Sequence, residues 1–265
     1  MSVNKQGYLS KELGEITVKI KNKLLPYFTL FEKLNEFAQD TVFLLKVNNQ
    51  NLQQITLAAL YLRILSSYQS IYLLCEKGLN TESKIILRAL LENVFRFVAI
   101  IKHPELAKQY VNQDYYHQKK AMNKLFEDDP SLKTINELTQ ITVDNKRKIE
   151  EDSIPELGII EYADKAELMS LYRTLYTHLC HSAHSNIRDV EKLLVFDTDL
   201  KLSTFKWGPN DFEIDLAIFG AINCLLIVLQ KMNEVFIIID EERYLSLHSD
   251  FEKLKKSYLD KHTNT

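Results

Sequence analysis

The sequence contains very few of the residues that interrupt a helix. Among 265 residues there are 6 Gly and 5 Pro, roughly a third and under a half of their average frequencies. Glycine and proline are the residues least compatible with a helix interior, so a chain with so few of them is expected to form long helices. With 46% hydrophobic and 26% charged residues, the composition is that of a globular protein. The sequence therefore predicts an all-α fold.

The spacing of apolar residues predicts where the helices lie. Breaks in the helical pattern fall at Gly78, at His103-Pro104 and at residues 208–210. The expected helices span about residues 8–47 (one or two helices), 51–77, 82–102, 105–126, 162–186 and 211–239. The helix at 82–102 is apolar on nearly every side, so we expect it in the centre of a bundle.

Two stretches depart from this pattern. Residues 127–155 are polar and charged, and we expect them to form a surface excursion. Residues 193–207 contain short alternating apolar residues, which predicts a small hairpin or an irregular connection. Beyond the break at 208–210, Asn210 and Glu213 have the spacing of a capping box, which predicts that the last long helix starts there.

The chain shows no internal repeat and no low-complexity linker. We therefore expect one multi-helix bundle. Its predicted parts are an N-terminal helical segment packing on the bundle, a helical core domain and a charged C-terminal helix or tail: residues 1–50, 51–240 and 241–265.

The cysteines and the N-terminus indicate a cytoplasmic protein. Cys75, Cys180 and Cys224 are far apart in apolar, helical surroundings, which is typical of free thiols in a reducing compartment. The first residues lack the apolar core of a signal peptide. The longest apolar stretch, residues 216–229, is interrupted by two less apolar residues and is expected to be too short to span a bilayer. We expect no membrane anchor.

The net charge of −3 gives no global attraction for nucleic acid or acidic lipid. Basic residues are interspersed with acidic ones, and no recognition helix stands out. We therefore do not expect binding to duplex DNA, although a local basic site remains compatible with this charge.

Histidines concentrate in one short segment. Three of the seven, His178, His181 and His184, follow Arg173 at a spacing of three, and imidazole exchanges protons near neutral pH. On an ideal helix Arg173, His181 and His184 share the side roughly opposite the core leucines, which we call the histidine stripe, and His178 lies at its flank. Arg173 and His178 would be separated by about 140°. They could meet only at a kink, across a dimer axis or against another helix.

A second polar row lies on the most apolar helix. Its members, four residues apart, are Lys84, Arg88, Glu92 and Arg96. Exposed i,i+4 ion pairs would explain the row. However, unpaired charge in an apolar helix is costly, so we expect Arg88 and Glu92 to face a polar cavity or a buried network. The histidine stripe is the expected counterpart.

The histidines have two other interpretations. A histidine beside an apolar face is often a structural residue whose hydrogen bonds are satisfied. Histidines at i and i+3 can also share a metal ion. This segment lacks the third ligand and the glutamate of a zinc protease motif, so we expect neither a metal nor another cofactor.

Several short motifs resemble bacterial domain-of-unknown-function family 5677. They are Gly78, Ile-Leu-Arg-Ala-Leu-Leu-Glu at 86–92, His103-Pro104-Glu105, Tyr172-Arg-Thr-Leu through His181 and His184-Ser185, and Gly208-Pro209 before a long last helix. The resemblance covers about residues 50–235. It implies an all-helical fold without an assigned activity.

A weaker similarity is to the HEPN superfamily of bacterial defence and toxin–antitoxin systems. Many of its members are metal-independent ribonucleases, with an Arg and a His four to six residues apart at a dimer interface. Arg173 and His178 fit that spacing. The residue after the arginine is commonly Asn, Asp or His in that superfamily, whereas this chain has Thr174.

Two hypotheses follow. In the first, which the HEPN resemblance implies, the chain cleaves RNA in a bacterial defence or toxin–antitoxin system, as a homodimer or with a partner protein. The candidate catalytic residues are Arg173, His178, His181 and His184, with Arg88, Glu92 and Tyr172 in support. In the second, the chain is a non-catalytic interaction or sensor protein. Its polar residues would then form a buried network or a small-ligand pocket.

Overall fold

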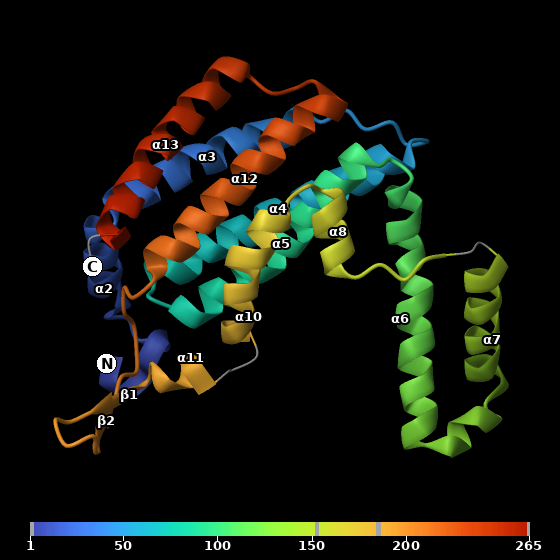
Figure 1. Ribbon diagram of the computed structural model, residues 1–265, viewed down its shortest axis with the longest axis horizontal. Coiled ribbons are helices and arrows are strands. Elements are labelled where there is room, and N and C mark those ends of the chain that lie inside the picture. The colour runs from blue at the N-terminus through green and yellow to red at the C-terminus, as the bar shows by residue number, and fades with distance from the viewer. Residues whose placement is uncertain (1–2, 152–153, 184–186, 264–265) are drawn as a thin grey trace.

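The computed structural model describes residues 3–151, 154–183 and 187–263. The fold is an all-α bundle with one small hairpin, as the sequence predicts (Figure 1). The elements of the first half are α1 (Val3–Gln6), the 3-10 turn η1 (Gly7–Leu9), α2 (Leu13–Lys23), α3 (Leu25–Leu44), α4 (Leu52–Glu76), α5 (Asn80–Lys102), α6 (Leu106–Asp128) and the 3-10 turn η2 (Pro130–Thr134).

The second half contains shorter elements before its two long terminal helices. They are α7 (Asn136–Glu151), α8 (Ile159–Lys165), α9 (Met169–Leu171), η3 (Tyr172–Tyr176), α10 (Thr177–Ala183), α11 (Ile187–Glu191), β1 (Leu194–Phe196), β2 (Leu202–Phe205), α12 (Ile214–Phe236) and α13 (Glu241–Thr263). The single helix expected at 162–186 is therefore broken. Glu167, between α8 and α9, has a left-handed φ of 58°, which no regular helix contains.

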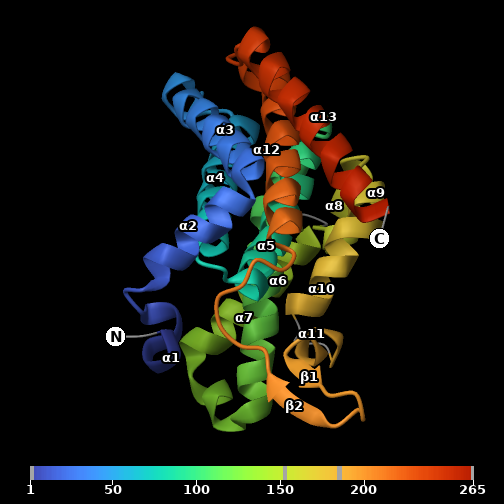
Figure 2. The ribbon, with the colours of Figure 1, turned by 90° about the vertical axis from the view of Figure 1, so that its left-hand side faces the viewer.

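Helix α5 is the centre of the bundle. It contacts α4, α12, α10 and α8, and Leu87, Leu90, Leu91 and Val94 are fully buried. This agrees with its apolar composition on nearly every side. Helices α3, α12 and α13 contact one another, and Figure 2 shows α12 between α3 and α13.

Helix α12 has the composition of a membrane span but is buried in the protein. Within the described ranges it alone is long and apolar enough to cross a bilayer, and 67% of its most apolar window is buried. The helix is longer than the apolar stretch expected from the sequence, so the expectation that this segment is too short was wrong. Its burial is instead what marks it as a core helix.

The polar region after α6 is more helical than expected. The turn η2 connects α6 to α7, and α7 packs along α6. This pair of helices projects from the bundle at the opposite end from the hairpin (Figure 1). The expected domain division at residues 50 and 240 remains a prediction, although α2 and α3 contribute residues to the same apolar core as α4 and α5.

The turn between α4 and α5 fixes the segment that leads into α12. Gly78 ends α4 with a φ of +73°, and its carbonyl accepts a hydrogen bond from Asn210 N. A Cβ at this position would lie 2.7 Å from Asn210 N, closer than such atoms approach. Glycine is therefore required here for both its conformation and its size.

Strands β1 and β2 form a short antiparallel hairpin at the surface. Leu194 pairs with Phe205, and the register shifts between Val195 and Phe196. In the turn, Asp197 accepts hydrogen bonds from the backbone N–H groups of Asp199 and Lys201. The hairpin expected at 193–207 is confirmed, and the side chains of β2 are exposed.

Candidate functional site

The segment that carries the predicted site contains a π-helical turn. Tyr172–Tyr176 form this turn, and the Thr177 hydroxyl donates to the Tyr172 carbonyl five residues earlier at 2.9 Å. A π turn contains more residues than an α turn, which brings residues five apart closer to the same side, and such turns are frequent at functional sites. The separation of about 140° expected for a straight α-helix therefore does not apply to Arg173 and His178.

The structure separates the predicted site residues. Arg173, His178 and His181 are all exposed. Of these three, His178 lines a cavity, together with Thr174 and Leu175, and Arg173 and His181 are not part of that lining. The predicted His184 lies outside the described residues.

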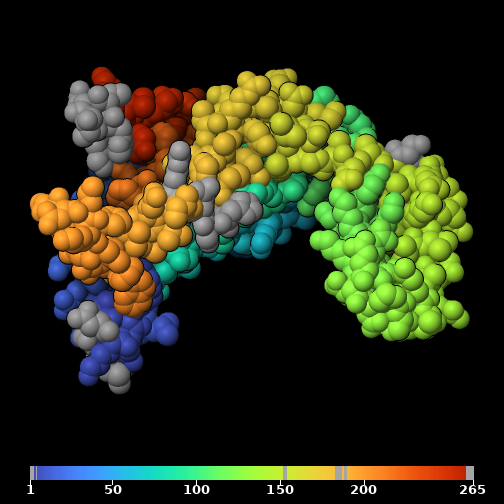
Figure 3. All heavy atoms as spheres, turned by 60° about the horizontal axis from the view of Figure 1, so that its bottom comes forward, coloured from blue at the N-terminus to red at the C-terminus, as the bar shows by residue number. Residues whose placement is uncertain are grey.

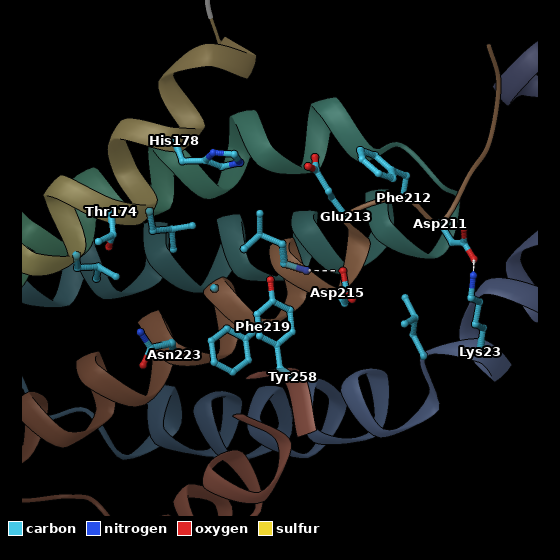
Figure 4. A pocket seen from close by; sticks show the side chains of 15 residues that line it. Lys23, Thr174, His178, Asp211, Phe212, Glu213, Asp215, Phe219, Asn223 and Tyr258 are labelled. Carbon is cyan, nitrogen blue, oxygen red and sulfur yellow. Dashed lines mark hydrogen bonds and ion pairs between the residues drawn. The ribbon is translucent and has the colours of Figure 1, made fainter. Parts of the chain in front are cut away.

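The cavity beside His178 has a volume of about 750 Å³. It lies between the end of α2, the start of α12, Tyr258 of α13 and the segment from Leu171 to His181, which we call the histidine segment (Figure 4). Its polar walls include three acidic residues two apart at the start of α12, and its apolar walls include three aromatic rings. These residues are Asp211, Glu213 and Asp215, and Phe212, Phe219 and Tyr258.

Glu213 is held at the edge of this cavity by two lysines. Its carboxylate accepts a hydrogen bond from Lys84 Nζ at 2.8 Å and forms an ion pair with Lys192 Nζ at 3.1 Å. The Lys84 side chain is only 1% exposed, and such a buried ammonium group needs a nearby negative charge. The expected capping box at Asn210 and Glu213 is wrong, because Glu213 has a left-handed φ of 55° and does not cap α12.

Electrostatics keep the Glu213 carboxylate charged. Burial acts to raise its pKa, but the hydrogen bonds and charges of Lys84 and Lys192 outweigh burial, so the pKa of Glu213 falls below its ordinary value of 4.5. The carboxylate is therefore ionised across the physiological range.

The surroundings of His178 favour its neutral imidazole form. Burial lowers its pKa below the ordinary value of 6.5, and the positive charges of Lys192 and Lys84 act in the same direction. The Glu213 carboxylate opposes this shift by favouring the protonated ring. Figure 4 shows His178 and Glu213 on neighbouring walls of the cavity. A neutral imidazole beside a carboxylate can accept a proton and be stabilised once it has done so.

Arg88 and Glu92 form a network beneath the same segment. The Arg88 guanidinium donates to Tyr176 Oη at 2.8 Å and to Cys180 Sγ at 3.4 Å, and pairs with Glu92 at 2.9 Å. Tyr176 Oη donates to Glu92 at 3.0 Å. The expected polar network exists, but its counterparts are Tyr176 and Cys180, which contact Arg88 of α5, whereas Arg173 and His181 are exposed.

Tyr172 supports this network through its ring. It stacks on Tyr176 with centroids 5.0 Å apart and contacts Phe95 of α5 at 6.2 Å. The Arg88 guanidinium lies over the Tyr176 ring, 4.9 Å from the ring centroid. These contacts hold the π turn against the central helix.

Within the ranges that the structure describes, no three His, Cys, Asp or Glu residues are grouped to hold a metal ion.

Sequence reasoning missed the part of the site that lies outside the histidine segment. Lys84 belonged to the polar row on α5, but nothing in the pattern connected it to a residue 129 positions away. Glu213 was assigned to a helix cap. The available signal was Lys84 itself, a charged residue on the most apolar helix of the chain. A charge buried in such a helix requires a partner of opposite charge.

Comparison with protein-family models gives one match. The model described as "Family of unknown function (DUF5677)" matches residues 54–201, more than half of the chain, from α4 to the hairpin turn. The curated proteins and the solved structures gave no match.

Proposed function

The chain belongs to the DUF5677 family of unknown function, and from the arrangement around His178 we propose that it is a metal-independent endoribonuclease. The observation that carries this proposal is the imidazole of His178 in the wall of the cavity, beside the Glu213 carboxylate. Arg173 lies five residues earlier, in the π turn, and is exposed outside this cavity, where its permanently charged guanidinium is accessible to a phosphate. The spacing also resembles that of HEPN ribonucleases.

In the proposed reaction His178 takes the proton of a ribose 2′-hydroxyl. The 2′-oxygen attacks the adjacent phosphorus, the bond from phosphorus to the 5′-oxygen breaks, and that oxygen leaves with a proton from water. The products are a 2′,3′-cyclic phosphate and a 5′-hydroxyl. Arg173 stabilises the charge that develops on the phosphate oxygens, and Glu213 stabilises the imidazolium. The Arg88–Glu92–Tyr176 network positions the segment.

The proposal includes a biological setting. The chain would act in the cytoplasm, in a bacterial defence or toxin–antitoxin system. It would work as a homodimer or with a partner protein of that system. His181 and His184 are the alternative proton-transfer residues within the same segment.

Cleavage in the presence of a chelator tests the proposal. The purified chain should cut single-stranded RNA in EDTA, and Arg173→Ala or His178→Ala should reduce the rate at least a hundredfold. The matched controls are Arg63→Ala on α4 and His117→Ala on α6, both at exposed positions away from the cavity. Undiminished cleavage by both site variants, or no cleavage by the purified wild type, would refute the assignment.

The cavity favours a second candidate, a non-catalytic sensor that binds a small ligand. Its volume of about 750 Å³ lies in the range of small-molecule sites, which are mostly apolar with a few placed polar groups. Expression in bacteria separates the two functions. A toxic ribonuclease should lose its toxicity when Arg173 and His178 are replaced together, whereas a sensor should be tolerated equally with or without them.

A further inference from the structure

A second cavity lies on the other side of the Lys84–Glu213 pair. It has a volume of about 410 Å³ and is walled by the first turn of α5, the end of α11, the segment before α12 and the N-terminal turn. In Figure 3 the hairpin region, drawn in orange, lies beside the blue N-terminal segment at one end of the molecule. We call this cavity the basic–aromatic cleft. Its defining residues are Tyr8, Asn80, Lys192, Lys206, Trp207 and Phe212.

Two aromatic rings of the cleft are exposed although they are held in place. Trp207 is 68% and Phe212 is 45% exposed. The Trp207 ring packs edge-on against Tyr8, with centroids 6.4 Å apart. It also covers Gly7 so closely that a Cβ there would lie 2.8 Å from the ring. A fixed ring with a free face is a surface on which another flat ring can stack.

Positive charge accompanies these rings. Lys206 and Lys192 lie over the Phe212 ring, at 5.3 and 5.7 Å from its centroid. Lys192 also pairs with Glu213, whereas Lys206 has no carboxylate partner in the part of the chain that the structure describes. Glu82 contributes one negative charge to the walls. The cleft thus offers Lys206 as the cation available to an incoming phosphate.

The first turn of α5 supplies polar groups at the base of the cleft. No side chain caps this helix terminus, so its N–H groups can bind an anion. The Oδ1 atom of Asn80 is buried and accepts no hydrogen bond from the described residues. A buried acceptor without a donor is costly, and a turn of the Asn80 side chain into the cleft would let this atom accept a hydrogen bond from a nucleobase amino group or a ribose hydroxyl.

We infer that the basic–aromatic cleft binds one nucleotide of single-stranded RNA. The base would stack on Trp207, and its phosphate would lie between Lys206 and the start of α5. Phe212 lines both this cleft and the cavity of His178, so a strand bound at Trp207 continues toward the proposed catalytic residues. The direction of the strand rests on the proposed function. The inference specifies the substrate of that function as unpaired RNA, because bases within a duplex are not free to stack on a protein ring.

The chain contains its own reporter for this interaction. Trp207 is the single tryptophan, so stacking of a base on it should quench the intrinsic fluorescence of the protein. We expect a saturable quench when a single-stranded RNA oligonucleotide is added to the His178→Ala protein, which cannot cleave it under the proposal. The same RNA annealed into a duplex should give little quenching. Equal quenching by both forms, or none by the single strand, would overturn the inference.

Substitutions provide the second measurement. With a fluorescein-labelled oligonucleotide, Trp207→Ala should weaken binding about 5- to 150-fold, the range for loss of one base–aromatic stack, and Trp207→Phe should restore most of it. Lys206→Gln should weaken binding and reduce the dependence on salt by about one phosphate contact. Phe43→Ala and Lys133→Gln, at exposed positions on α3 and η2, are the matched controls. Binding that is unchanged by Trp207→Ala would refute the site.

The two proposals fail separately. If RNA binds at Trp207 but the wild-type protein never cuts it, the ribonuclease proposal is wrong and the nucleotide site stands. If RNA is cut in a His178-dependent reaction while Trp207→Ala binds normally, the nucleotide site is wrong and the ribonuclease proposal stands.

Discussion

Replacing Glu213 with alanine should destabilise the protein by about 3 kcal/mol. The substitution removes the carboxylate that pairs with Lys84, whose side chain is 1% exposed. Removing one partner of a buried pair costs about 3–5 kcal/mol, because the other charge stays buried. The Glu213 side chain is 24% exposed, so water partly replaces it and the lower end of this range applies.

The backbone at this position allows a finer test. Glu213 has a φ of 55°, a left-handed conformation that costs a residue with a Cβ about 1–2 kcal/mol. Glycine has no Cβ and adopts this conformation without the penalty. Glu213→Gly should therefore destabilise the protein by about 1 kcal/mol less than Glu213→Ala, although both variants lack the carboxylate.

Urea denaturation measures both effects as changes in the free energy of unfolding. The double variant Lys84→Met/Glu213→Ala should recover most of the lost stability, since it leaves no buried charge behind. Glu252→Ala, in an exposed pair with Lys255 on α13, is the control and should cost less than about 1 kcal/mol. The reasoning is refuted if Glu213→Ala costs no more than this control, or if the double variant is no more stable than the single one.

The same pair sets a pH dependence. The folded-state pKa of Glu213 is lower than its ordinary value of 4.5, so the unfolded chain binds more protons in the acidic range. The stability that the pair contributes is complete above pH 4.5 and is lost as the pH falls through the folded-state pKa. Wild-type protein should lose stability across this window, and Glu213→Ala should lose less.

Three further predictions concern the surroundings of the site. The His178 ring should titrate below 6.5 in an NMR pH titration, so the cleavage rate should rise with pH as this ring loses its proton; a midpoint at or above 6.5 would contradict the site's electrostatics. Tyr176→Phe removes the hydroxyl that joins Arg88 to Glu92 and should lower the free energy of unfolding by about 1.5–3 kcal/mol, whereas a change below about 0.5 kcal/mol would mean that the network contributes little. Gly78→Ala should cost at least about 2 kcal/mol by urea denaturation, since it combines a left-handed φ with a steric clash, and a neutral effect would contradict the geometry of that turn.

Local pattern predicted most of the fold. The scarcity of Gly and Pro, the apolar circumference of residues 82–102 and the alternation at 193–207 correctly indicated an all-α bundle, its central helix and its hairpin. The matched family region, residues 54–201, lies within the stretch of about residues 50–235 over which the short motifs resemble the family, and it ends before the Gly208-Pro209 motif. Helical periodicity failed where the chain departs from an α-helix, because a period of 3.6 residues assumes regular geometry.

The site was only partly predictable for the same reason. The histidine segment was visible as a concentration of imidazoles, and Arg88 and Glu92 as charges on an apolar helix. However, the angular positions assigned to them assumed a continuous α-helix. In the structure α5 meets Tyr176 of the π turn and Cys180 of α10 rather than Arg173 or His181.

The sequence by itself determined which segments are helical and which of them is central, since these depend on residues a few positions apart. Only the tertiary structure decided that Glu213 leaves the helical conformation to reach Lys84, 129 positions away, and that His178 and Glu213 line the same cavity. The physical reason is that burying the Lys84 ammonium group requires a countercharge. That requirement outweighs the local preference of the residue that supplies it.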